Sequence, residues 1–408
     1  MEIVGKYNTL LTMIDTLDES VLSQLYAILN EESFKGSKIR IMSDCHAGKG
    51  CVVGFTAKVS DKIIPNLVGV DISCTVSATK LDINSDNIDF EKLDKVIRNN
   101  IPSGSSVRES PHELIPVVFA NNIEKISKEI GDYDNLNRHL LSLGTLGGGN
   151  HFISVEVDEN NKPWLLVHCG SRNFGHKICQ YHQKKAFDNC RNIIIEKKKN
   201  VINIPEKERQ SYLESLKDIN FNKDFAYLEG KDLEQYINHV EIAKRFTKIN
   251  HTIIIYEILS HMYWSSVKNI FTNHNYIEQL KDGFMIRKGA VSAKKDEVFV
   301  LPLNMRDGSL ICIGKGNDEW NQSAPHGAGR LMSRSQAKKE IDFEDFKESM
   351  KNVWSTSIKL STIDEAPFVY KNYEDIINSL NDVADIKHHL KPIYNLSLIH
   401  ISEPTRPY

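Results

Sequence analysis

Six short segments, spread from residue 44 to residue 330, each place a metal-binding or nucleophilic side chain beside glycine or another small residue. They are Asp44–Gly50, Gly69–Cys74, Gly147–His151, His168–Arg172, Asn273–Asn275 and Pro325–Arg330. Histidine, cysteine and aspartate are the usual ligands of a transition metal, and neighbouring glycines let backbone N–H groups approach a phosphate. A site that uses all six segments must gather most of the chain, so the pattern predicts one catalytic domain that binds a metal and a nucleotide together.

Length and composition favour one large soluble domain. The chain has 408 residues, of which 40% are hydrophobic, and this is enough for a large packed core. The N-terminal residues have neither the apolar core of a signal peptide nor a transit-peptide composition, and no apolar run approaches membrane-spanning length. We therefore expect a cytoplasmic protein with no membrane partner.

The net charge and the cysteine content indicate how the protein could bind RNA and whether its cysteines form disulfides. The net charge is −3, whereas proteins that coat long stretches of nucleic acid are usually basic, so an RNA ligand would be recognised at an end. The seven cysteines are an odd number without a framework spacing, which predicts reduced thiols. Six of them are interpreted as small core or loop residues, and Cys74 is the exception.

Hydrophobic periodicity predicts helices and strands without regular βαβ alternation. Helices are expected at residues 8–32, 90–99, 113–130, 136–142, 335–350 and 373–381, and over most of residues 176–259. Strands are expected at residues 39–42, 52–58, 76–81, 164–168, 284–288, 297–303 and 309–314. This order favours an α+β fold with a mixed β core, flanking helices and a helical insertion. Within the insertion, Lys197–Lys199 is interpreted as a solvated helix face rather than an RNA-binding patch.

The last residues, 397–408, continue no periodicity and look like translated adapter or vector sequence. We therefore expect one catalytic domain over residues 1–396, followed by a non-native tail.

Asp71 and Cys74 lie three residues apart after an apolar stretch. A thiolate can bridge two metal ions, and a nearby carboxylate adds negative charge to one of them. The same spacing is also typical of a capped turn, so the pair does not establish a metal site by itself.

Three histidines are further candidate ligands. His151 and His168 are seventeen residues apart, which fits two strands joined by a turn at residues 158–162 with one histidine at each strand end. His274 lies between two asparagines and is the third candidate. A single histidine of this kind is usually structural, but a pair that flanks a hairpin is equally consistent with metal ligation.

His326 is the clearest candidate nucleophile, because a neutral imidazole can attack an α-phosphate and hold a nucleotidyl group as a labile P–N adduct. The glycines around it keep the approach open, and Arg330 and Arg334 could neutralise phosphate charge. The alternative is a histidine near the cap of a helix, since residues 328–339 are compatible with a helix. The two interpretations are compatible, because a helix N-terminus also binds phosphate.

Taken in order, these segments resemble RtcB-type RNA ligases. The matching motifs are Asp44–Gly50, Gly69–Cys74, Leu143–Phe152, His168–Arg172, Arg287–Ala293, Gly314–Asn317, His326–Arg334, Asp364–Pro367 and Tyr370. The likeness covers residues 1–396 and implies a single-domain α+β fold peculiar to the family. It also implies ligation of RNA 3′-phosphate or 2′,3′-cyclic phosphate ends to 5′-hydroxyl ends in tRNA splicing or RNA repair. The implied cofactors are GTP and two manganese ions, and the implied partners are tRNA halves or damaged RNA, with an activating protein left open.

The resemblance also implies a role for each matching residue. Cys74 would be the thiolate shared by two manganese ions, and Asp71, His151, His168 and His274 would complete their shells. His326 would carry the guanylate. The implied GTP-binding residues are Asn150, His151, Phe152, Ile153, Ser154, His274, Asn275, Pro302, Leu303, Asn304, Met305, Ser309, His326, Gly327, Ala328 and Gly329.

The chain departs from the family pattern at several positions. Ser73 and Thr75 stand where the family has glycine, Ser154 replaces a glutamate that touches the nucleotide, and Leu303–Arg306 differs from the family's Gly-Ser-Met-Gly loop. The family ends in Lys-Gly, and the lysine contacts the guanylate, whereas this chain has Ser397 at the start of its tail. We expect these changes to affect GTP affinity and base choice more than the metal chemistry.

Two other functions use part of the same residue set. A two-metal phosphoesterase would need the same ligands but no covalent histidine. A binding protein for RNA ends would keep the fold without turnover. The nucleophile candidate His326 argues against the first function, and the complete set of candidate residues argues against the second.

Overall fold

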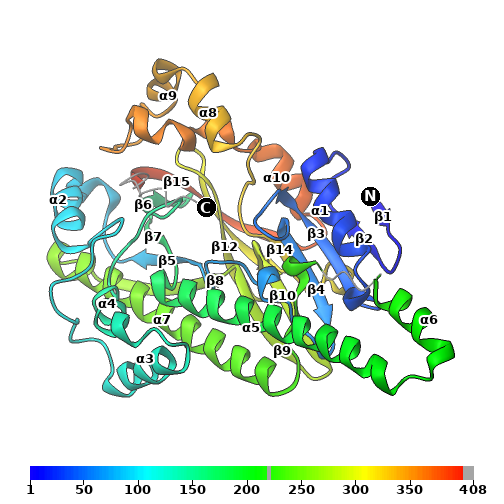
Figure 1. Cartoon of the computed structure of the whole chain (residues 1–408). Helices are drawn as coiled ribbons and strands as arrows, with labels where there is room; N and C mark the ends of the chain where they lie inside the picture. The colour runs from blue at the N-terminus through cyan, green and yellow to red at the C-terminus, as the bar shows by residue number, and fades with distance from the viewer. Residues whose placement is uncertain (218–221, 398–408) are drawn as a thin grey trace.

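The computed structural model describes residues 1–217 and 222–397, and two large β-sheets form its centre (Figure 1). The first sheet has the strand order β1-β2-β3-β4-β10-β9. Its strands are β1 (Glu2–Val4), β2 (Thr9–Thr12), β3 (Lys38–His46), β4 (Val53–Val59), β9 (Asn275–Leu280) and β10 (Gly283–Lys288). Only β2 and β3 pair in parallel among the described strands of this sheet.

The second sheet is antiparallel throughout its described pairs and has the order β12-β13-β15-β6-β7-β5-β8. Its strands are β5 (Thr75–Leu81), β6 (Phe152–Val157), β7 (Pro163–Cys169), β8 (Ser266–Asn273), β12 (Val298–Asn304), β13 (Gly308–Gly314) and β15 (Ala384–Ser397). A two-stranded ribbon of β11 (Ala290–Ser292) and β14 (Ser323–Pro325) completes the β structure of the described chain.

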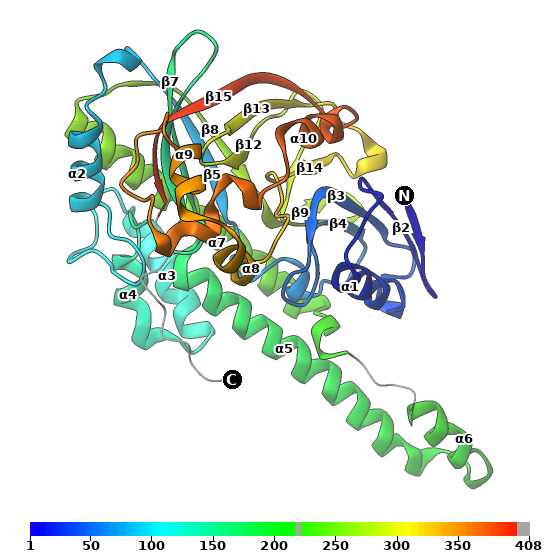
Figure 2. The same ribbon diagram turned by 90° about the horizontal axis from the view of Figure 1, so that it is seen from above.

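The described chain has ten α-helices. They are α1 (Glu19–Leu29), α2 (Phe90–Asn100), α3 (Val117–Glu129), α4 (Leu136–Leu141), α5 (Arg172–Lys199), α6 (Glu206–Lys217), α7 (Gly230–Met262), α8 (Arg334–Glu340), α9 (Phe343–Ser349) and α10 (Tyr373–Leu380). Helix α7 contacts α5 and strands of both large sheets, β7 and β9, so this helical layer holds the sheets together (Figure 1). The far end of α5 and α6 project away from the body (Figure 2).

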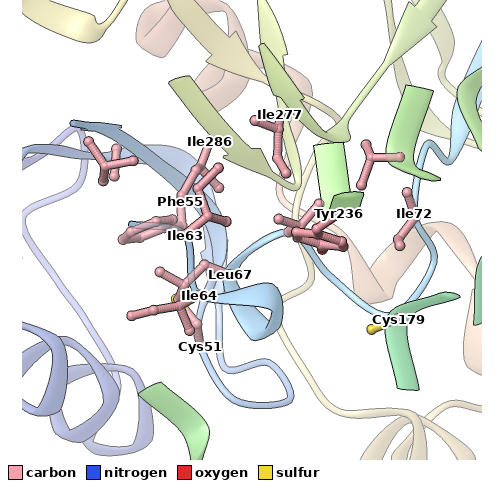
Figure 3. Packing of buried hydrophobic residues seen from close by; sticks show 14 of the residues in the cluster. Cys51, Phe55, Ile63, Ile64, Leu67, Ile72, Cys179, Tyr236, Ile277 and Ile286 are labelled. Carbon is pink, nitrogen blue, oxygen red and sulfur yellow. The ribbon is translucent and has the colours of Figure 1, made fainter. Parts of the chain in front are cut away.

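The largest hydrophobic cluster joins the first sheet to this helical layer. Figure 3 shows Phe55 of β4 and Ile286 of β10 on one side, with Tyr236 of α7 and Cys179 of α5 on the other. All four side chains are fully buried. The sheet and the helices therefore share one continuous core, and burial of this apolar surface is the main force that fixes their relative position.

The predicted α+β class is confirmed, and most predicted elements lie within a few residues of the observed bounds. The expected hairpin between the two histidines is β6 and β7, in which Phe152 pairs with His168. The lysine run at 197–199 is exposed at the end of α5, as expected for a solvated face. Among the described residues, no helix is both long enough and apolar enough to cross a membrane.

Three helix predictions were wrong in part. The single helix expected at residues 335–350 is two helices, α8 and α9, because α8 ends at the extended Ile341 and Asp342 caps the start of α9. The expected helix at residues 8–32 begins with strand β2, because Leu10 to Thr12 pair with β3, and the helix itself begins at Glu19. The helix-compatible stretch after His326 is irregular until α8 begins at Arg334, where the Ser333 hydroxyl accepts from the amide N–H of Gln336. His326 therefore does not lie at a helix N-terminus.

Strand β15 was not predicted. Its residues Lys387, His388 and His389 interrupt the apolar pattern of a buried strand, and Pro392 cannot donate a ladder hydrogen bond. The strand nevertheless pairs with β13 on one side and β6 on the other, with irregular register near the proline. Its last residue, Ser397, pairs with Phe152, whereas the rest of the expected non-native tail lies outside the described residues.

Candidate metal and nucleotide site

Adjacent strand ends bring three of the predicted metal ligands together. Thr75, the first residue of β5, pairs with the last residue of β7 and with the last residue of β8. Each of these positions is next to a candidate ligand in the sequence, so Cys74, His168 and His274 converge at one edge of the sheet. The geometry follows from antiparallel pairing, in which residues at the same level of neighbouring strands face each other.

Cys74 is at the centre of this group. Its Sγ is 3.2 Å from Nε2 of His168 and 3.7 Å from Nε2 of His151. The carboxylate Oδ2 of Asp71 is 3.4 Å from the same nitrogen of His151. The ligand atoms of Cys74, His151 and His168 all lie within 4.8 Å of one another, and the group could hold a metal ion.

Backbone carbonyls orient two of the imidazoles. Nδ1–H of His151 donates to the carbonyl of Leu146 at 2.8 Å, and Nδ1–H of His168 donates to the carbonyl of Asn150 at 3.1 Å. A carbonyl accepts only from a protonated nitrogen, so the proton of each neutral ring is on Nδ1 and the lone pair is on Nε2, the ring nitrogen nearest to Cys74. This is the tautomer that a metal ligand requires, and such outer hydrogen bonds typically fix metal-binding histidines.

The electrostatics of the cluster also fit a metal. Burial lowers the pKa of His168 and of His274 well below the ordinary value, and neighbouring histidines add to the effect. Both imidazoles are therefore neutral at physiological pH. Burial, with a contribution from Asp71, raises the pKa of the Cys74 thiol well above its ordinary value, so the thiol keeps its proton until a metal replaces it.

His274 connects this cluster to the candidate nucleophile. It lies between β8 of the second sheet and β9 of the first, and its backbone N–H donates to the carbonyl of Cys74 at 3.1 Å. Its ring centroid is 5.3 Å from that of His168 and 4.9 Å from that of His326. Nδ1 of His274 is buried and has no hydrogen-bond partner among the described residues, which leaves a free nitrogen ligand beside the cluster.

Asp44 holds His326. Nδ1–H of His326 donates to Oδ2 of Asp44 at 2.5 Å, and the same oxygen accepts the backbone N–H groups of His326 and Gly327 at 2.9 and 3.3 Å. This bond uses the proton on Nδ1, so the neutral ring has its lone pair on Nε2, the atom that would act as a nucleophile. Gly329 has a φ of +74°, and a Cβ there would lie 2.8 Å from Cα of Asp44, so the loop depends on glycine to pack this closely.

The role of Asp44 was missed at the level of the sequence. The residue opens one of the recognised motifs, but it is 282 positions from His326 and nothing in the spacing relates the two. An aspartate just before a Gly-Lys-Gly stretch was the available signal. Its fully buried side chain needs a partner, and a histidine is one of the residues that can supply it.

One cavity of about 1000 Å³ contains most of the predicted site. Of the predicted metal ligands, Asp71, Cys74, His168 and His274 line it. Of the predicted GTP-binding residues, Asn150, Phe152, His274, Asn275, Pro302, Leu303, Asn304, Met305, Ser309, His326, Gly327, Ala328 and Gly329 also line it. The cavity is large enough for a nucleoside triphosphate together with part of a second substrate.

Four other predicted residues have side chains that are buried elsewhere or already paired within the protein. The Ile153 side chain packs in a hydrophobic cluster, and the Ser154 hydroxyl donates to the carboxylate of Glu156. Arg330 and Arg334 line the cavity but form ion pairs, both with Glu365. Their charge is thus already partly compensated within the protein.

Ser73 introduces backbone strain beside the cluster. Its φ is +60°, a left-handed conformation that costs an L-residue about 1 kcal/mol, and its buried hydroxyl has no partner among the described residues. We expect Ser73→Gly to raise the free energy of unfolding by about 1 kcal/mol, measured by urea denaturation. Ser265→Gly is the matched control, since Ser265 is exposed and is not among the described residues with positive φ, and this change should not stabilise. A lower midpoint for Ser73→Gly would contradict the strain argument.

This α+β fold and this cavity define a protein with a candidate transition-metal cluster next to an aspartate-held histidine. Comparison with known families assigns the chain further. The family described as tRNA-splicing ligase RtcB matches residues 29–397. The chain belongs to the RtcB family.

Similar proteins come from several organisms. The chain is 28% identical over 386 residues to the RNA-splicing ligase RtcB of Escherichia coli (strain K12), covering 87% of this chain and 88% of the relative. It is 26% identical to the tRNA-splicing ligase RtcB of Aeropyrum pernix, covering 82% of each chain. It is 23% identical to the tRNA-splicing ligase RtcB of Nanoarchaeum equitans, covering 84% of each chain.

Proposed function

We propose that this protein is a GTP- and manganese-dependent RNA ligase that joins 3′-phosphate or 2′,3′-cyclic phosphate ends to 5′-hydroxyl ends. The observation that supports this most is the hydrogen bond from His326 to Asp44 in the cavity that also contains Cys74 and its histidines. A metal cluster alone would serve many hydrolases. An oriented neutral imidazole beside it is what a covalent nucleotidyl-transfer step needs in addition.

The first step is self-guanylylation. Nε2 of His326 attacks the α-phosphate of GTP, a P–N bond forms, and the bond to the leaving pyrophosphate breaks. As the imidazole gains positive charge, the Asp44 carboxylate stabilises it through Nδ1–H. When bound, manganese held by Asp71, Cys74, His151, His168 and His274 supplies Lewis-acid stabilisation of the phosphate charge.

Two transfers complete the reaction. A 2′,3′-cyclic phosphate end is first hydrolysed: water attacks phosphorus, and the bond to the 2′-oxygen breaks to leave a 3′-phosphate and a 2′-hydroxyl. An oxygen of the RNA 3′-phosphate then attacks the guanylate, the P–N bond breaks, and His326 returns to its neutral form. The 5′-hydroxyl of the second RNA then attacks the activated 3′-phosphate, and GMP leaves. The RNA target is proposed to be tRNA halves or damaged RNA in the cytoplasm, as the family resemblance implies.

The covalent step is directly testable. Incubation of the full chain with α-³²P-GTP and manganese should give a labelled protein band on a denaturing gel, and γ-³²P-GTP should give none. Chelation of the metal should abolish the label. A two-metal phosphoesterase would show no label with either nucleotide, and label from the γ-phosphate would show that phosphate rather than guanylate is transferred.

Asp44→Asn tests the orienting hydrogen bond. The amide can still contact the ring but cannot stabilise its positive charge, so we expect the rate of guanylylation to fall by about a hundred-fold or more. Bound metal, measured by elemental analysis, should stay at the wild-type level because Asp44 is not among the ligands. Asp318→Asn is the control, because Asp318 lies on an exposed turn outside the cavity. A parallel loss of metal would mean that Asp44 acts on the cluster instead.

A further inference from the structure

A buried carboxyl group in the wall of the cavity has no role in the steps above. Glu156, on β6, is only 3% exposed and lines the cavity. Its Oε1 accepts hydrogen bonds from the hydroxyls of Ser154 at 2.8 Å and Ser309 at 3.2 Å. Its Oε2 is buried and has no partner among the described residues. Burial raises the pKa of Glu156 to about 8, so the carboxyl group lacks a cation or other strong donor to stabilise its charge.

A second unpartnered oxygen lies on the neighbouring strand. Asn395 of β15 is directly opposite Ser154 in the sheet, and it also lines the cavity. It is 4% exposed, and its Oδ1 has no hydrogen-bond partner among the described residues. Residues opposite each other in an antiparallel pair share a face, as do residues two apart on one strand, so Glu156, Ser154 and Asn395 lie on the same face.

Unpartnered buried acceptors are costly, and a ligand with N–H donors would satisfy them. The cavity wall thus has two buried oxygens without a hydrogen-bond partner among the described residues, Oε2 of Glu156 and Oδ1 of Asn395. Guanine presents adjacent N1–H and N2–H₂ donors on one edge, whereas adenine presents an acceptor at N1 and one amino group. An ionised carboxylate can only accept, so it matches guanine and opposes the adenine ring nitrogen.

We propose that Glu156, assisted by Asn395, receives the N–H donors of guanine and makes this site select guanine over adenine nucleotides. The proposal rests on the proposed function, because that function requires a nucleotide in this cavity. It also gives Ser154 a role in the site. The Ser154 hydroxyl donates a hydrogen bond to the carboxylate of Glu156, which lies two residues further along the same strand and would contact the base. Guanine donors would stabilise the charge that burial otherwise opposes.

The test is equilibrium binding of GMP, IMP and AMP to the full-length protein in manganese, measured by calorimetry. Monophosphates avoid the covalent step, and IMP lacks only the 2-amino donor. The wild type should bind GMP about ten- to a hundred-fold more tightly than AMP, the range expected for a charge-assisted hydrogen bond, with IMP between them. Glu156→Gln places an amide where the acceptor was, so the GMP-to-AMP preference should collapse to within a few-fold.

Glu159→Gln is the matched control, because Glu159 is an exposed carboxylate at the turn of the same hairpin and outside the cavity. It should keep the wild-type preference. If Glu156→Gln keeps the wild-type preference, the proposal is overturned. Should that variant lose its cooperative thermal transition, Asn395→Ala supplies the same comparison, and an unchanged preference there also overturns the proposal.

Labelling with GTP separates this inference from the proposed function. A wild type that forms no covalent guanylate, yet has a guanine preference that Glu156→Gln removes, supports the base-reading role and contradicts the ligase. A wild type that forms the covalent guanylate, but whose preference for GMP over AMP survives in Glu156→Gln, supports the ligase and contradicts the base-reading role. Absence of any nucleotide binding would overturn both.

Discussion

Cys74→Ala is expected to abolish both guanylylation and RNA joining and to lower bound manganese far below the wild-type level. The reason is position: the thiol lies within 3.7 Å of Nε2 of both His151 and His168, at the centre of the ligand group. If one thiolate serves two ions, its removal should cost more than the loss of any single histidine. We expect the rate of RNA joining to fall by at least about a thousand-fold. The two measurements are this rate and the metal content by elemental analysis.

His151→Ala and Cys169→Ala are the comparisons for this change. His151→Ala removes one ligand and should lose less metal than Cys74→Ala. Cys169→Ala removes a neighbouring buried thiol whose sulfur contacts Asn250 rather than the cluster, and it should keep its metal. If Cys74→Ala joined RNA at nearly the wild-type rate, the Cys74 thiol would not be required as a metal ligand for catalysis.

His326→Ala is expected to eliminate the protein-bound guanylate while the metal remains. Because the role of His326 ends once the guanylate has moved to RNA, the variant should still seal RNA supplied with a pre-activated 3′ end. The rate on unactivated RNA should fall by at least about a thousand-fold, since the covalent route is lost altogether. The measurement is the ratio of joining rates on the two substrates.

Two results would contradict this role. Equal loss on activated and unactivated RNA would make His326 a structural residue or a metal ligand. Loss of metal in His326→Ala would have the same meaning, and it can occur because the ring is close to His274. His46→Ala is a useful control, because His46 also lines the cavity, while its Nδ1 hydrogen-bonds to a backbone carbonyl, that of Asp44, rather than to a side chain.

Local patterns were sufficient to predict the hairpin and the convergence of His151 and His168, because the turn and the alternation are encoded within eighteen residues. Contacts between distant segments were beyond such reasoning. Nothing near Asp44 indicates that it binds the backbone and ring of His326, because that pairing depends on how β3 and the loop after β14 meet.

The surroundings of Glu156 in the cavity wall also depend on contacts between distant segments, which local patterns do not predict. Ser154 was noted as a departure from the family pattern, but Glu156 was not singled out. Its environment depends on β13 and β15, which come from much later in the chain. β15 in turn was missed because Lys387 is exposed and His388 and His389 are half-buried, and these polar residues hide the alternation of its buried half.

The place of β15 in the sheet has a consequence for biosynthesis. It is the last strand along the described chain, yet it lies between β13 and β6 rather than at an edge. Until it emerges from the ribosome, the second sheet is two separate pieces, each with an open row of N–H and C=O groups. Such edges readily pair with other chains. A nascent chain of this protein is therefore most vulnerable to aggregation until β15 has emerged and filled the gap between β13 and β6, and chaperone occupancy should be highest in that interval.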